Sequence, residues 1–189
     1  IEHMLFKGTK KRNARQISRE IERNGGILNG FTSEQLTSYW CKIPSDKLDI
    51  ALDVLSDMIK NPLFDDNEIE KERKVIFEEM KMYKDNPKMH VFDKIKELLY
   101  DGNFSLPIIG TVKSMKGNDS VKLKKFFVEI YNPKNIILCI VGDADFDKVC
   151  YFAENNFKDY GIKSNYPKVK LRNEELVEKR KSIDQANLV

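Results

Sequence analysis

The chain has 189 residues and a mass of 22.1 kDa, with 33 basic and 30 acidic side chains and a formal net charge of +3. This near balance predicts no nucleic-acid partner. No apolar run approaches the ~20 residues needed to cross a bilayer, so we also expect no membrane partner. The densest basic run lacks interleaved aromatic residues, and we expect it to form a solvated loop and helix start: Lys7, Lys10, Lys11, Arg12 and Arg15.

The cysteines exclude two kinds of structural site. Cys41, Cys139 and Cys150 are odd in number, far apart and without C-x-x-C spacing. Neither a disulfide framework nor a structural zinc ribbon fits that pattern. A reducing compartment suits three free thiols, so we expect a cytoplasmic protein.

Two helices and two strands are predicted in the first third of the chain. A helix over 14–23 is followed by a glycine pair that suits a helix C-terminus. The runs 27–33 and 36–43 are rich in β-branched and aromatic residues and are short enough to pair as neighbours. Ser45 is placed to cap the next helix, which Asn61-Pro62 ends.

A long helical pattern begins at residue 65 or 66, runs to about residue 85, and resumes after a break at Asn86-Pro87. Two acids, Glu72 and Glu79, interrupt its otherwise apolar stripe. Burial of an ionised carboxylate without a partner costs several kcal/mol, so a cation, an arginine or a metal should lie close to them. Helix periodicity alone leaves both a metal ligand and a structural ion pair open for Glu79.

The rest of the chain predicts further helices, one more strand and a polar linker. Ser120 begins a helix, the apolar run 135–141 is typical of a buried strand, and 147–160 reads as a further helix. The polar stretch 163–181 suits an interdomain linker. We therefore predict a first domain over 1–162 and, from 182 to 189, the first strand of a second domain.

The first residues match the second half of the motif H-x-x-E-H, in which two histidines on one helical face bind zinc. Glu2 and His3 are the matching pair, and the first histidine of the motif would lie two residues before Ile1. In that motif Glu2 would be the general base. Adjacent Glu and His residues are common in proteins, so the pair alone is equally consistent with solvated terminal residues.

The spacing between His3 and Glu79 is 76 residues, and it joins several other segments in a resemblance to one family. The chain is similar to the insulinase and pitrilysin superfamily of zinc peptidases, above all to its mitochondrial processing peptidase branch and bacterial relatives. The segments that carry the resemblance are Glu2–Thr9, Gly25-Gly26, Asn29 with Thr32-Ser33, Glu72–Glu79, Pro107–Thr111, Tyr131-Asn132-Pro133 and Val141-Gly142-Asp143.

This resemblance implies an α+β fold in which helices pack on a mainly antiparallel sheet, as half of a processing-peptidase-like metallopeptidase fold. A second domain of the same chain would complete each half of a peptide chamber. It implies zinc as cofactor, with His3 and Glu79 as ligands, Glu2 as the base that takes a proton from zinc-bound water, and Glu72 in support. The strand with Asn29 would pair with an extended peptide substrate. The implied substrate-side residues are Asn29, Phe31 and Thr32.

The predicted function is therefore a zinc-dependent endopeptidase that acts on peptides or extended polypeptide segments. An alternative is a non-catalytic peptide-binding or structural subunit of the same superfamily, and another is an unrelated helical scaffold whose buried acids pair with Arg12 or Arg73. His90 lies in a segment that the family does not use for zinc. We expect the 189-residue chain alone to be inactive, and the whole protein could be a homodimer or have a paired subunit.

Overall fold

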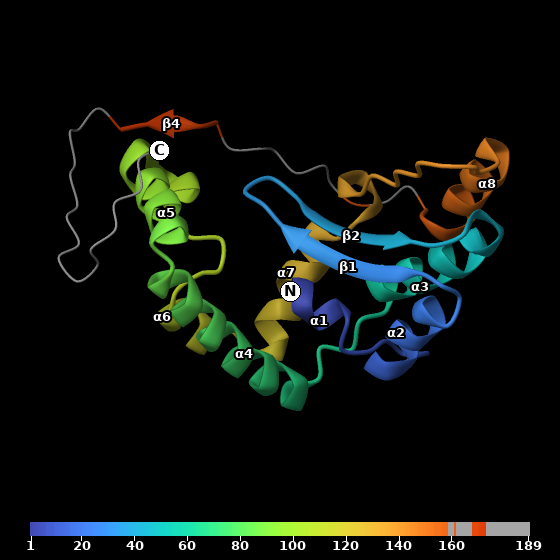
Figure 1. Cartoon of the computed structure of the whole chain (residues 1–189), viewed down its shortest axis with the longest axis horizontal. Helices are drawn as coiled ribbons and strands as arrows, with labels where there is room; N and C mark the ends of the chain where they lie inside the picture. The colour runs from blue at the N-terminus through green and yellow to red at the C-terminus, as the bar shows by residue number, and fades with distance from the viewer. Residues whose placement is uncertain (159–160, 162–167, 173–189) are drawn as a thin grey trace. The chain divides into compact units, whose positions relative to one another are not determined.

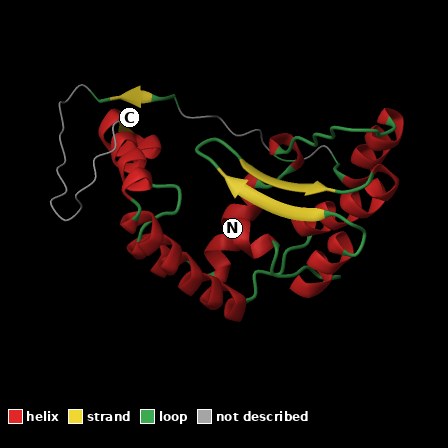
Figure 2. Ribbon diagram, viewed as in Figure 1, coloured by secondary structure: helices red, strands yellow, loops and turns green. Residues whose placement is uncertain are grey.

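The computed structural model describes residues 1–158, 161 and 168–172 (Figure 1). The chain forms two compact units, one built from Ile1–Ile69 with Asp119–Asn165 and the other from Glu70–Asn118 with Tyr166–Val189. Helices and short antiparallel strands make up both, which confirms the predicted α+β class (Figure 2). Within the described part of the chain, no helix is long and apolar enough to span a membrane.

The first unit holds the longer of the two sheets found in the described residues and a helical layer that packs on it. Its core joins side chains from five helices, including Ile69 at the start of α4 (Asp66–Asp85), to the inner face of that sheet. The elements are α1 (Glu2–Leu5), α2 (Ala14–Glu22), β1 (Ile27–Thr32), β2 (Thr37–Lys42), η1 (Ser45–Lys47), α3 (Leu48–Lys60), α7 (Ser120–Ile130), η3 (Pro133–Asn135) and α8 (Phe146–Asn156). The fully buried side chains of this core are Leu5, Ile17, Ile21, Val54 and Met58.

The strands β1 and β2 form an antiparallel pair with two different faces. Their register places Leu28 opposite Cys41 and Gly30 opposite Tyr39. Leu28, Tyr39 and Cys41 pack against the core, because successive side chains of a strand point to opposite faces. The other face carries exposed residues of β1, among them Phe31, which is 50% exposed.

Helix α2 begins where its capping residues dictate. The Asn13 side chain accepts from the backbone N–H of Gln16, and the Gln16 side chain accepts from the backbone N–H of Asn13. This capping box satisfies two backbone donors that the helix leaves without partners. Ile17 and Ile21, one turn apart, then face the core.

Two predicted features of the first unit are wrong. Ser45 does not cap α3, since it lies in the 3₁₀ turn η1, where the Lys47 N–H donates to the Pro44 carbonyl at 2.9 Å. That tight turn satisfies the start of the helix in place of a side chain. The run 135–141 does not form a strand, and Ile137 and Val141 are 91% and 94% exposed. No described strand pairs with it, and apolar composition produces a buried strand only where a partner supplies hydrogen bonds and cover.

The second unit contains most of α4 (Asp66–Asp85), α5 (Pro87–Leu99), β3 (Tyr100–Asp101), η2 (Gly102–Ser105), α6 (Val112–Lys116) and β4 (Lys170–Leu171). The predicted break between the two long helices is confirmed, because Asn86 caps α5 and Pro87 occupies its first turn. Within the segment predicted as a linker, β4 pairs with β3. The predicted strand 182–189 and the last two residues of the predicted helix 147–160 lie outside the described residues.

Candidate active site

Helix α1 carries the predicted base Glu2 and the predicted zinc ligand His3, and the core of the first unit holds it in place. Its residues Met4 and Leu5 are buried, with 4% and 0% of their surface exposed. The four-residue helix is too short to be stable alone, so these contacts provide its stability. Glu2 and His3 remain half-buried at its open side.

Close contact between α1 and β1 depends on Gly30. A Cβ at this position would lie 3.1 Å from Cζ of Phe6 and 3.0 Å from the Ser38 carbonyl oxygen. The Phe6 ring also contacts Tyr39, with ring centroids 5.9 Å apart. A glycine therefore lets the residue that follows α1 pack directly on the strand pair.

The three predicted substrate-side residues occupy different faces of β1. Asn29 and Phe31 are exposed and alternate with Leu28 and Gly30, which face the core. Thr32 continues the inner series, and its hydroxyl donates a hydrogen bond to Oε2 of Glu2. The strand thus places two of these side chains on the solvent face and the third on the Glu2 carboxylate.

Beyond Thr32, the hydroxyl groups of Thr37, Tyr131 and Tyr39 form a row that leads toward the core. The Oγ1 atoms of Thr32 and Thr37, cross-strand neighbours, are 3.3 Å apart, and Thr37 also hydrogen-bonds the hydroxyl of Tyr131. The hydroxyls of Tyr131 and Tyr39 are 2.9 Å apart. Burial, and then the neighbouring Tyr131, raise the pKa of Tyr39, and burial also raises the pKa of Tyr131. Both hydroxyls therefore stay protonated at neutral pH.

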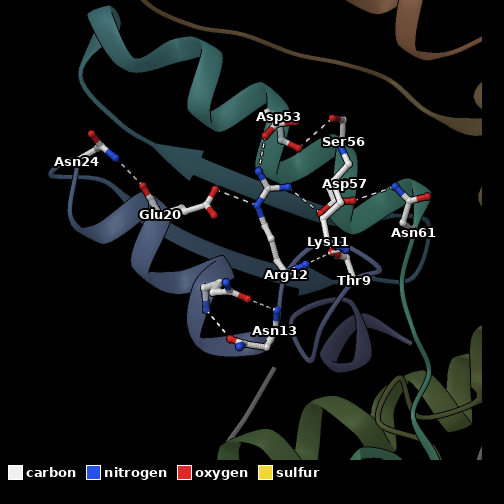
Figure 3. A network of polar contacts seen from close by, with 11 residues as sticks. Thr9, Lys11, Arg12, Asn13, Glu20, Asn24, Asp53, Ser56, Asp57 and Asn61 are labelled. Atoms are coloured by element: carbon white, nitrogen blue, oxygen red, sulfur yellow. Dashed lines mark hydrogen bonds and ion pairs between the residues drawn. The ribbon is translucent and has the colours of Figure 1, made fainter.

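A second polar network fixes the loop between α1 and α2 to α3 (Figure 3). Arg12 donates from Nε to Glu20 at 2.9 Å and from Nη1 to Asp57 at 2.8 Å, and its Nη2 pairs with Asp53. The Thr9 hydroxyl donates to the same oxygen of Asp57 at 2.6 Å. The side chains of Arg12 and Asp57 are only 10% and 1% exposed. Most of the Arg12 side chain is thus covered and paired with acids, which corrects the prediction of a solvated basic cluster at this residue.

Opposing effects act on the pKa of Asp57. Burial raises this pKa, but hydrogen bonds from Thr9, Asn61 and Arg12 outweigh burial and hold it below the usual range. The carboxylate is therefore ionised at neutral pH, as an ion pair with Arg12 requires. Sequence reasoning missed this pair, although Asp57 follows the buried Val54 by three residues on the same face of α3.

In the second unit, the two predicted acids of α4 differ in exposure. Glu72 is buried, with 7% of its surface exposed, and Glu79 is half-buried. Their neighbour Glu78 is exposed and pairs with Lys81 at 2.7 Å. Arg73, on the same helix, pairs with Glu70 and donates to the carbonyl of Asn118 at 2.8 Å. The acid stripe predicted from periodicity is thus most buried at Glu72.

The side chains of His3 and Glu79 are of types that bind zinc, but two protein ligands are fewer than such a site uses. Imidazole nitrogen and carboxylate oxygen are both common zinc ligands, so His3 and Glu79 fit that metal. Among residues 1–158, 161 and 168–172, no group of three or more His, Cys, Asp or Glu side chains is arranged to hold an ion. Because a zinc site that keeps an open position uses three protein ligands, these two residues would need a further one.

Comparisons with known proteins identify relatives over the whole chain. The chain is 35% identical to the Bacillus subtilis protein YmxG, described as an uncharacterized zinc protease, over 100% of this chain and 46% of that protein. It is 33% identical to the beta subunit of the Saccharomyces cerevisiae mitochondrial-processing peptidase, over 83% of this chain and 34% of that protein. The chain thus spans less than half the length of these relatives.

A solved structure and two family models agree with these relatives. The crystal structure of a protease from Helicobacter pylori superimposes with a TM-score of 0.79 at 25% identity, over 90% of this chain and 42% of that one. The model of the family "Peptidase M16 inactive domain" matches residues 120–189. The model of the family "Insulinase (Peptidase family M16)" matches residues 1–112. The chain therefore belongs to the insulinase family of peptidases, M16.

Proposed function

We propose that the protein, at its full natural length, is a zinc-dependent endopeptidase that hydrolyses peptides or extended polypeptide segments. The observation that carries this proposal is the placement of Glu2, whose carboxylate is held by Thr32 on a helix that also presents His3. A carboxylate beside a potential metal ligand is the arrangement that a general base requires. The zinc protease and processing peptidase names of the relatives support the same class.

The residues of this chain would divide the chemistry between them. His3 and Glu79 would hold zinc together with a further ligand, and the half-buried state of both leaves them accessible. When bound, zinc supplies the Lewis acidity that makes water nucleophilic at neutral pH. Glu2 would take the proton of the attacking water and return it to the amine leaving group. Glu72, buried on the same helix as Glu79, would support that ligand.

The substrate would bind as an extended strand beside β1. In the described residues β1 pairs with β2 alone, so its other edge has backbone groups that a peptide can pair with. Asn29 and Phe31 stand exposed next to that edge. Backbone pairing of this kind binds many sequences, with side-chain contacts adding preference. We propose that a second domain of the full-length protein closes over this strand.

The proposal is tested by zinc content and chelator-sensitive peptide cleavage of the full-length protein. Glu79→Gln should lose both zinc and activity, because it removes a ligand. Glu2→Gln should keep the zinc and lose activity by a factor of about 100 or more, the size expected for loss of a general base. Glu78→Gln is the matched control, since this neighbour is exposed and paired with Lys81, and it should keep both properties.

Three outcomes separate the proposal from its alternatives. The endopeptidase is supported if the wild-type protein binds one zinc per chain and cleaves peptide. Glu79→Gln should then lose both properties, and Glu78→Gln should keep both. A folded full-length protein that binds peptides without zinc or cleavage would instead indicate a non-catalytic peptide-binding subunit. Equal effects of Glu78→Gln and Glu79→Gln would remove Glu79 from the site.

A further inference from the structure

The hydrogen bond between Thr32 and Glu2 has a fixed direction. A carboxylate only accepts hydrogen bonds, so the Thr32 hydroxyl must donate its one proton to Oε2 of Glu2. Such a bond to an ionised acceptor is stronger than one between neutral groups. The second oxygen of Glu2, Oε1, has no part in this bond.

Thr32 is itself held in place by its cross-strand neighbour Thr37. It is the last residue of β1, where the register pairs it with Thr37, and the two Oγ1 atoms are 3.3 Å apart. Thr37 in turn hydrogen-bonds Tyr131, whose ring stacks on Phe127 of the core with centroids 4.6 Å apart. The hydroxyl that meets Glu2 is therefore connected through its neighbours to the core of the first unit.

Thr32 is also separated from the other residues implied in substrate binding. Asn29 and Phe31 lie on the solvent face of β1, whereas Thr32 shares the face of Leu28 and Gly30, toward α1. A side chain cannot face both a peptide on the outer side and Glu2 on the inner side. The position of its hydroxyl favours a role that acts through Glu2.

We propose that Thr32 is a positioning residue, whose hydroxyl fixes Glu2 in the orientation that a general base needs. This inference rests on the proposed peptidase function. A glutamate at the start of a four-residue helix has several side-chain rotamers, and a charge-assisted bond to one oxygen selects among them. Removal of comparable supporting hydrogen bonds lowers activity by roughly 10- to 100-fold.

The test uses Thr32→Val and Thr32→Ser in the full-length protein. Valine has nearly the shape of threonine without the hydroxyl, and serine keeps the hydroxyl. We expect Thr32→Val to lower kcat by roughly 10- to 100-fold with KM and zinc content unchanged, and Thr32→Ser to keep kcat within about threefold of wild type. Because Thr32 is exposed, both variants should fold, which circular dichroism and the melting temperature verify.

A second readout needs no turnover. In a Glu2→Gln background, the affinity for an uncleaved peptide should not change when Thr32 becomes valine, because the residue contacts Glu2 rather than the peptide. Weaker peptide binding in that background, a higher KM, or a kcat within twofold of wild type for Thr32→Val would overturn the positioning role. Failure of Thr32→Ser to restore kcat would overturn it as well. A wild-type protein without chelator-sensitive cleavage would instead refute the proposed function, and the inference with it.

Discussion

Replacement of Arg12 by methionine should strongly destabilise the first unit. Methionine keeps an unbranched apolar side chain but removes the charge and every side-chain N–H donor of arginine. The change leaves the carboxylate of Asp57, which is 1% exposed, without its cationic partner. A buried charge that loses its partner is costly because neither water nor another cation can replace it.

The size of the effect follows from the exposure of the three partners. Removal of one member of a buried pair costs ~3–5 kcal/mol of unfolding free energy. Thr9 at 2.6 Å and Asn61 at 2.9 Å still donate to Asp57, so we expect the lower end of that range. Glu20 and Asp53, whose side chains are 26% and 54% exposed, add only ~0–1 kcal/mol each. The expected loss is therefore about 3–5 kcal/mol.

Urea unfolding followed by circular dichroism measures this loss. With a slope near 2 kcal/mol per molar urea, the midpoint should fall by roughly 1.5–2.5 M. Lys148→Met is the matched control, because it breaks the Lys148–Asp49 pair, whose side chains are 55% and 70% exposed. That variant should lose less than about 1 kcal/mol. Asp57→Asn combined with Arg12→Met should cost less than the sum of the single changes, since the two residues share one interaction.

The pH dependence provides a further check. The pKa of Asp57 lies below its usual range in the folded protein, so the stability that this carboxylate contributes is present above its unfolded pKa of about 3.9. That stability is lost as the pH falls through the folded value. The gap between wild type and Arg12→Met should therefore narrow below about pH 3.9. A loss of less than 1 kcal/mol at pH 7, or a gap that does not change in acid, would refute the reasoning.

Three further predictions concern the first unit. Asn13→Ala should cost ~1 kcal/mol in urea unfolding because it removes the capping box of α2, and a cost below about 0.3 kcal/mol would contradict that. Cys139 is exposed, whereas burial raises the pKa of the Cys41 thiol. Alkylation followed by mass spectrometry should therefore label Cys139 before Cys41, and equal labelling rates at the two cysteines would contradict this. The raised pKa values of Tyr39 and Tyr131 mean that unfolding releases protons above about pH 10, so stability should fall as pH rises past 10, and less steeply in Tyr39→Phe; parallel slopes for both proteins would contradict this.

Local patterns predicted much of the fold of both units. In the first unit, the helix that starts near Ala14 and the strand pair that follows it depend on capping residues and alternation. In the second unit, the break at Pro87 depends on proline, and all these signals act within a few residues. The apolar run 135–141 was predicted wrongly because a strand exists only with a partner, and no local pattern encodes one. The prediction that Ser45 caps α3 was also wrong. A 3₁₀ turn and a side-chain cap can each satisfy the backbone N–H groups at the start of a helix, and the sequence did not distinguish them.

The candidate site was predictable only in part. The residue types at positions 2, 3 and 79 indicated metal chemistry through spacing and resemblance, and no contact in the described residues tests those roles. Arg12 and Asp57 are 45 residues apart in the sequence, so the residues next to either one do not predict the pair. The face of β1 that carries Thr32 followed from alternation, but its contact with Glu2 required the position of α1. Sequence thus indicated candidate groups, and the packing showed which side chains contact them.

The short length of α1 has a consequence for the order of events in folding. A four-residue helix does not form alone, and the contacts that hold its neighbourhood span 30 residues from Glu2 to Thr32 and 48 from Thr9 to Asp57. Closure of such loops costs entropy that only the finished core repays. Glu2 and His3 should therefore acquire their geometry in one of the last steps, after the strand pair and α3 have formed. A metal site that depends on this geometry would therefore form late, since a preformed site rarely exists in an unfolded chain.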